Sequence, residues 1–178
     1  MDDAMGISGA SQAATEAWER TIEDLRAMGE QRREDGWEVV EVVTVHTSPV
    51  GRDHGSDDRF GLVHVVPDNH ADAFTDAFER GEFTQFEAYR NEVDGYAFHV
   101  IELIDPDAEL VVLLAGNYDL HRADGLVQSA VDEGATYTHA KTIDGTHLGS
   151  VRHEEYEPLL PDPDAVGLPG EAAREDEA

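Results

Sequence analysis

The pattern of hydrophobic and polar residues predicts helical and extended segments along most of the chain. After Ser11, a residue type common at helix N-caps, apolar side chains recur at helical spacing until Glu34, and Gly36 then stops the helix. Residues 37–46 and 59–66 are rich in β-branched residues and predict two strands, separated by a polar loop. The first third of the chain therefore reads as helix, strand, loop and strand.

The rest of the chain predicts two further helices and five further strands. One helix begins after Pro67 and ends at Gly81, and another begins after Asp119 and ends at Gly134. The five strands are expected at residues 83–92, 96–104, 109–115, 135–143 and 146–153. Helices and strands thus alternate irregularly, which is typical of an α+β fold.

The order of the elements predicts an α+β fold with about three helices on one face of a largely antiparallel sheet. A weak internal repeat, in which residues 77–81 echo residues 130–134, is consistent with a duplicated strand-helix-strand unit. A ferredoxin-like variant is one member of that class. We expect a loose leader at residues 1–10, a single domain at 11–156 and a disordered acidic tail at 157–178.

Charge adds an expectation about the solvent. Aspartate and glutamate number 40 against 12 lysine and arginine residues, for a net charge of −28, and Lys141 is the single lysine. Such a surface repels itself at physiological ionic strength, whereas above about 1 M salt the Debye length falls to roughly 3 Å. Because 40% of the residues are hydrophobic and fall in periodic segments, a disordered acidic chain fits poorly. We therefore expect a halophilic protein from a salt-rich cytoplasm.

Composition also excludes several function classes. Without cysteine there is no disulfide, thiolate nucleophile or thiolate metal site. No basic stripe favours nucleic acid, and the apolar run from Leu110 to Ala115 is too short to span a bilayer. The acidic start at Met1 lacks the features of a signal peptide, which again favours a cytoplasmic protein. The sequence has none of the common nucleotide-binding, hydrolase or metalloprotease motifs. We therefore expect no cofactor, and we favour a non-enzymatic protein over an enzyme.

Several short motifs carry a resemblance to a known family. They are residues 58–62, residues 65–69, Tyr89-Arg90 and Tyr118-Asp119-Leu120. In these motifs the chain resembles a haloarchaeal family of unknown function, over roughly residues 11–160. The motifs correspond to strand ends and helix caps, and the resemblance implies a halophilic host without implying an activity.

The loop after the first strand contains residue types that bind divalent metals. These residues are His46, Asp53, His54, Asp57 and Asp58. A surface loop in so acidic a chain gathers such residues by chance, and a metal site needs fixed geometry. We therefore assign no metal site.

The dipeptide Asp94-Gly95 predicts a two-residue type I′ turn, and that turn sets the pairing of its two strands. Arg90 then lies directly opposite His99, beside apolar positions of the same face. Two interpretations remain open. The arginine either packs along a histidine ring, which we favour, or forms an anion-binding pair with His99 in a pocket.

The second dipeptide, Asp144-Gly145, predicts another such hairpin and a more unusual face. Its pairing would place Tyr137 opposite Arg152, His139 opposite Ser150 and Lys141 opposite Leu148. The candidate residues on that face are Tyr137, His139, Lys141, Ser150 and Arg152. Between Gly134 and His153 the single acid is Asp144, which is notable in a chain of this composition.

Three interpretations of this acid-depleted hairpin stay open: an ordinary solvated hairpin, a surface for self-association or a protein partner, and a site for an anionic ligand or catalysis. On the second interpretation the protein is a non-enzymatic binding or regulatory module that forms a homodimer. On the third, His139 acts as acid and base, Lys141 and Arg152 stabilise charge, and Tyr137 donates a hydrogen bond. We prefer the binding module.

Overall fold

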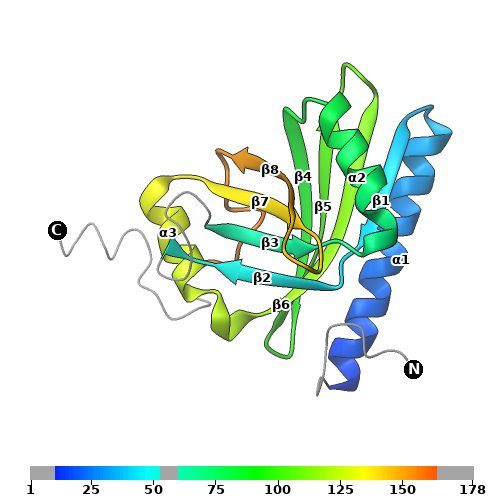
Figure 1. Cartoon of the computed structure of the whole chain (residues 1–178). Helices are drawn as coiled ribbons and strands as arrows, with labels where there is room; N and C mark the ends of the chain where they lie inside the picture. The colour runs from blue at the N-terminus through cyan, green and yellow to red at the C-terminus, as the bar shows by residue number, and fades with distance from the viewer. Residues whose placement is uncertain (1–10, 53–59, 164–178) are drawn as a thin grey trace.

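The computed structural model describes residues 11–52 and 60–163, and within them three α-helices pack with two four-stranded sheets (Figure 1). Sheet A has the strand order β1-β6-β5-β4, and sheet B has the order β2-β3-β7-β8. The elements are α1 (Gln12–Glu34), β1 (Glu38–Val43), β2 (His46–Val50), β3 (Gly61–Val65), α2 (Asp68–Arg80), β4 (Gln85–Val93), β5 (Tyr96–Asp105), β6 (Leu110–Asp119), a 3-10 turn η3 (Leu120–Arg122), α3 (Asp124–Glu133), β7 (Thr136–Lys141) and β8 (His147–His153). The α+β class expected from the sequence is confirmed.

Helix α1 covers the outer face of sheet A. Its N-terminus is capped as expected, because the Ser11 hydroxyl accepts a hydrogen bond from the backbone N–H of Ala14 at 3.1 Å. Trp18 and Leu25 on its apolar stripe are buried against the side chains of Phe98 and Leu113. The central strands β5 and β6 of sheet A are therefore buried on both faces, between α1 and sheet B, whereas β4 is exposed on one face.

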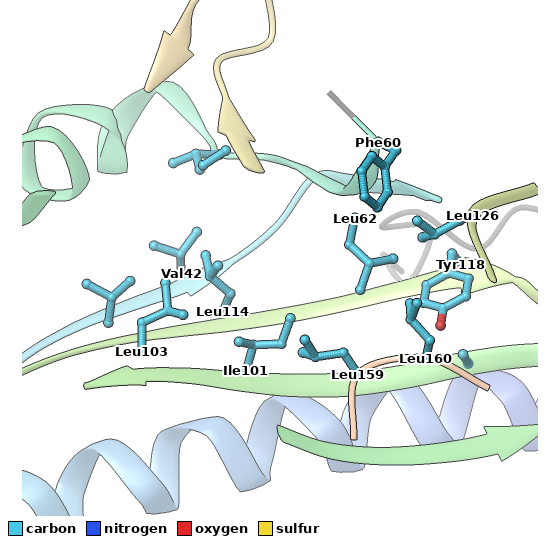
Figure 2. Packing of buried hydrophobic residues seen from close by; sticks show 14 of the residues in the cluster. Val42, Phe60, Leu62, Ile101, Leu103, Leu114, Tyr118, Leu126, Leu159 and Leu160 are labelled. Atoms are coloured by element: carbon cyan, nitrogen blue, oxygen red, sulfur yellow. The ribbon is translucent and has the colours of Figure 1, made fainter. Parts of the chain in front are cut away.

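The main core lies between the two sheets. The strands of sheet B run across those of sheet A, and apolar side chains from both fill the space between them (Figures 1 and 2). Leu62 from β3, Ile101 from β5 and Leu114 from β6 are fully buried there. This contact between sheets is the main source of hydrophobic stabilisation in the fold.

The strands form two sheets, where the sequence pattern predicts one. The predicted strand 37–46 divides after Val43, so that β1 pairs in parallel with β6 in sheet A while β2 pairs with β3 in sheet B. The two strand-helix-strand segments, β3-α2-β4 and β6-α3-β7, both cross from one sheet to the other. Among the described strands, four of the six pairings are antiparallel (β2–β3, β4–β5, β5–β6 and β7–β8), in line with the expectation.

The packed chain continues beyond the predicted domain boundary at residue 156. Leu159 and Leu160, which the sequence analysis placed in a disordered tail, are each only 1% exposed and contact the core beside Ile101 and Tyr118 (Figure 2). The residues around these two leucines are acidic or proline, and this composition led to the prediction of a disordered tail. In the ranges that the structure describes, no helix combines the length and apolarity of a membrane span.

Leu160→Ala should lower the free energy of unfolding by about 2–5 kcal/mol, because a buried leucine loses its transfer energy and leaves a cavity. Urea unfolding in 3 M KCl, followed by circular dichroism, measures the change. Glu157→Ala, an exposed site three residues away, serves as the control and should change the stability by less than about 0.5 kcal/mol. Equal stabilities of the two variants would contradict the packing of this segment.

Candidate functional site

The first hairpin has the predicted turn and register. Asp94 and Gly95 have φ angles of 51° and 85°, as a type I′ turn requires, and Arg90 lies directly opposite His99. Arg90 is ion-paired through Nη1 with Glu92 on its own strand, and His99 is 2% exposed. The pair therefore lies at the edge of the core, with the charge of the arginine matched by Glu92.

The second hairpin has a wider turn than predicted. Thr142 N–H donates to the Thr146 carbonyl at 2.9 Å, so three residues form the loop, and Gly145 takes the left-handed conformation with φ 95°. Lys141 is consequently paired with His147, where the sequence analysis expected Leu148. A bulge between Ala140 and Lys141 shifts the register by one residue.

Beyond that bulge the pairing is as predicted, with Tyr137 opposite Arg152 and His139 opposite Ser150. The register of sheet B places alternate residues of its four strands on the side away from sheet A. We call this side the outer face of sheet B. Its residues are His46, Ser48, Val50, Gly61, Val63, Val65, Tyr137, His139, Lys141, His147, Ser150 and Arg152. The five candidate residues share this face, and no position of the set is a carboxylate.

His139 is held by hydrogen bonds on both sides of its ring. A carbonyl oxygen only accepts, so His139 Nε2–H donates to the Phe60 carbonyl at 3.1 Å. In the neutral ring Nδ1 then accepts from the Ser150 hydroxyl at 2.6 Å, and Ser150 Oγ accepts in turn from His147 Nε2 at 2.7 Å. The residue is 6% exposed, and its imidazole connects β7 to β8 and to the segment before β3 through these hydrogen bonds.

Arg152 is tied to its own neighbours. Its Nε donates to Glu154 at 2.9 Å, and its Nη1 donates to the Tyr137 hydroxyl at 3.0 Å and reaches Glu133 at 3.5 Å. The hydrogen bonds with Glu154 and Tyr137 raise the pKa of Arg152. In the part of the chain that the structure describes, Lys141 has no ion-pair partner, so it is the cation of this face that remains available.

A second polar cluster lies inside the molecule, where β3 and β5 face each other. His64 Nδ1–H donates to the carbonyl of His139 at 3.2 Å, which leaves His64 Nε2 to accept from His99 Nε2–H at 2.9 Å. His99 Nδ1 is then an acceptor. Within the described residues it has no hydrogen-bond partner, and the same holds for the nearby donors Arg90 Nε and the Tyr118 hydroxyl.

Burial keeps the interior histidines neutral. It lowers the pKa of His64 to about 4 and holds that of His99 well below its usual value, with the charge of Arg90 acting in the same direction. His153, whose Nε2 lies 2.8 Å from the Thr138 hydroxyl, also has its pKa lowered to about 4 by burial. Sequence reasoning missed His64, and it noted His153 only as one of the histidines of the second hairpin. For His64 a signal existed, because it lies two residues from both Leu62 and Val66 and therefore points to the same buried face as they do.

Across the described ranges, no group of three or more histidine or carboxylate side chains is arranged to hold a metal ion. His64 and His99 approach each other without a third such ligand. Of the metal-binding types noted in the sequence, His46 lies on the outer face of sheet B, with its Nε2 2.8 Å from the Ser48 hydroxyl. Asp53, His54, Asp57 and Asp58 lie outside the described residues.

Comparison with protein-family models finds a match over most of the chain. The model of a family of unknown function (DUF7529) matches residues 4–161. That range contains both sheets, both polar clusters and the core leucines Leu159 and Leu160. Neither the curated proteins nor the solved structures include a match to the chain.

Proposed function

The chain belongs to the DUF7529 family of unknown function, and we propose that it is a non-enzymatic binding module that docks a second copy of itself through the outer face of sheet B. One observation carries the proposal. In a chain with a net charge of −28, the twelve positions of this face include no aspartate or glutamate. Solvation alone does not favour such a distribution.

Charge makes this face the favoured place for two copies to meet. Two molecules of net charge −28 repel each other wherever carboxylates face carboxylates. A face without carboxylates avoids the cost of burying like charges, and high salt screens the repulsion between the remaining surfaces. The same charge supports our inference that the protein is halophilic and works in a salt-rich cytoplasm.

The outer face is also self-complementary in charge. Lys141 lies at one end of β7, and Arg152 with its partners Glu133 and Glu154 lies at the other end, about 13 Å away along the strand. A two-fold axis through the middle of the face, near His139, brings Lys141 of each copy toward Glu133 and Glu154 of the other. An isologous dimer requires this kind of pairing.

Apolar groups on and beside the face supply contact area. Val63, Val65 and Tyr137 are half-buried in the single chain, so a second copy completes their burial. Val45 and Ile143, which are 40% and 61% exposed, flank the Lys141 end, where Val45 N–H bonds to the Val65 carbonyl. An apolar centre with charged groups at its rim is typical of a protein interface.

The hydrogen bonding of His139 supports binding over catalysis. A general acid or base must exchange a proton with a substrate, and both nitrogens of this ring already bond to Ser150 and Phe60. The cation of Arg152 is likewise engaged by Glu154. These contacts hold the side chains of His139 and Arg152 in fixed positions, so neither is available to react with a substrate.

Lys141→Glu should weaken the dimer at least about tenfold, because it places a carboxylate opposite Glu133 and Glu154 of the second copy. Sedimentation equilibrium in 3 M KCl over a range of concentrations measures the dissociation constant. The matched control is Arg20→Glu, which makes the same charge change at an exposed position of α1, on the side of sheet A away from sheet B, and should leave the constant unchanged.

A charge swap sharpens the test. Lys141→Glu combined with Glu154→Lys should recover most of the lost affinity, since the two charges exchange positions across the two-fold axis. A wild-type protein that stays monomeric at millimolar concentration would overturn the proposal. Equal dissociation constants for Lys141→Glu and Arg20→Glu would overturn it as well.

A further inference from the structure

The strand β1 forms one edge of sheet A and has half of its backbone groups unpaired. Its even-numbered residues bond to β6, as shown by the N–H of Glu38 to the Glu109 carbonyl at 2.9 Å and the N–H of Thr44 to the Ala115 carbonyl at 3.1 Å. In a parallel ladder the alternate residues point the other way. The N–H and C=O groups of Val39, Glu41 and Val43 therefore face the free edge of the sheet.

A groove runs along this free edge. It has a volume of about 370 Å³, and its walls come from α1 and α2, which lie on opposite faces of sheet A beside β1 (Figure 1). Leu25 and Arg26 of α1 form one wall, and His70 and Ala73 of α2 form the other. Its base contains Val39, Glu41 and Val43, the same residues whose backbone groups are unpaired.

The edge strand β2 of sheet B carries a proline, which blocks pairing, and β1 does not. Strand β2, at one edge of sheet B, contains Pro49, which lacks an N–H and interrupts any added ladder. Strand β1 has the sequence Glu-Val-Val-Glu-Val-Val, with high β propensity and no proline or glycine. The edge is thus suited to accept another strand.

We propose that an extended, acidic peptide segment of a partner protein adds to β1 as a fifth strand of sheet A. Three residues with outward N–H and C=O groups alternate donors and acceptors at the spacing of a β-ladder, and an extended polypeptide backbone matches that spacing. The groove limits the occupant to a single strand, because helices bound it on both sides.

Charge selects an acidic segment. The one carboxylate lining the groove, Glu41, is paired with Arg33 at 2.7 Å. Arg26 is exposed and has no ion-pair partner among the described residues, so the groove has an excess positive charge in a molecule of net charge −28. An aspartate or glutamate of the added strand pairs with Arg26, while its alternate apolar side chains pack on Val39 and Val43.

The test uses an array of random synthetic octapeptides, probed with the labelled full chain in 3 M KCl. We expect the bound peptides to be enriched in β-branched and acidic residues. Glu41→Pro should weaken their binding at least about tenfold, because it removes an edge N–H that makes no bond in the fold. Glu41→Gln is the matched control, since it also loses the Arg33 ion pair but keeps the N–H, and it should bind nearly as the wild type does.

A second measurement does not depend on how the proline variant folds. N-methylation of every other residue in a bound peptide should abolish binding in one of the two alternating patterns and leave it intact in the other, because only one set of amides faces β1. Lys141→Glu, on the other sheet, should change nothing. Bound peptides that tolerate both methylation patterns, or an array on which none binds, would overturn the proposal.

Discussion

Lowering the pH from 7 to 5 should destabilise the protein steeply, and the buried histidines are the reason. The pKa values of His64 and His153 are about 4 in the folded state, against 6.5 for a free side chain, and the pKa of His99 is also lowered. Below pH 6.5 the unfolded chain binds protons that the folded chain cannot. Each histidine therefore removes up to about 1.4 kcal/mol of stability per pH unit, until the pH reaches its folded-state pKa.

Urea unfolding at pH 7, 6 and 5 in 3 M KCl measures this dependence. His153→Gln should reduce the slope by about one proton, which is about 1.4 kcal/mol per pH unit. The matched control is His121→Gln, whose side chain is 87% exposed and should leave the slope as in the wild type. A stability that stays constant from pH 7 to pH 5 would show that the interior histidines are protonated in the folded protein.

Diluting the salt should have an effect of comparable size. On transfer from about 3 M to 0.1 M KCl we expect a marked fall in the unfolding temperature, or complete unfolding, because the repulsion within a chain of net charge −28 is no longer screened. Thermal unfolding followed by circular dichroism measures it. The salt dependence belongs to the whole surface, unlike the pH dependence, which arises in the core.

A variant with fewer charges tests the cause. Glu19→Gln, Glu23→Gln and Glu30→Gln remove three exposed carboxylates from α1 that make no ion pair among the described residues. The triple variant should lose less stability than the wild type on dilution. Identical melting temperatures of the wild type at both salt concentrations, or an equal loss in the two proteins, would refute the halophilic interpretation.

Hydrophobic periodicity predicted the helices and most strands because each of them buries one face. Helix α1 and the hairpin at Asp94-Gly95 follow local rules of capping and turn geometry, which depend on a few neighbouring residues. Strand β2 was missed, since its sequence His-Thr-Ser-Pro-Val alternates weakly and contains Pro49. The division into two sheets was missed as well, because β1 pairs with β6 from a distant part of the chain, and periodicity carries no information on such pairing.

The sequence predicted which five candidate residues share the outer face of sheet B, but it did not predict the hydrogen bonds that they make. Asp144-Gly145 forms a three-residue loop because the side chains of Thr142 and Asp144 both accept from the N–H of Thr146, at 3.0 and 3.2 Å. Hydrogen bonds donated to Asp144 by the hydroxyls of Thr142 and Thr146, and by the N–H of Thr146, lower the pKa of Asp144. That His139 bonds to the Phe60 carbonyl depends on the approach of a chain segment 79 residues away, and a hairpin register contains no such information.

The histidine contacts also set a boundary between the surface and the interior. Side-chain bonds run from His147 through Ser150 to the ring of His139, but the link onward to His64 passes through the backbone carbonyl of His139. A carbonyl has no proton to pass on, so a proton gained at His147 cannot travel by exchange to His99. The interior histidines therefore exchange no proton with the outer face of sheet B along this path. A charge on His139 still lowers the pKa of His64 through space, so the outer face and the interior are coupled by electrostatics and by the β7 backbone, without proton exchange between them.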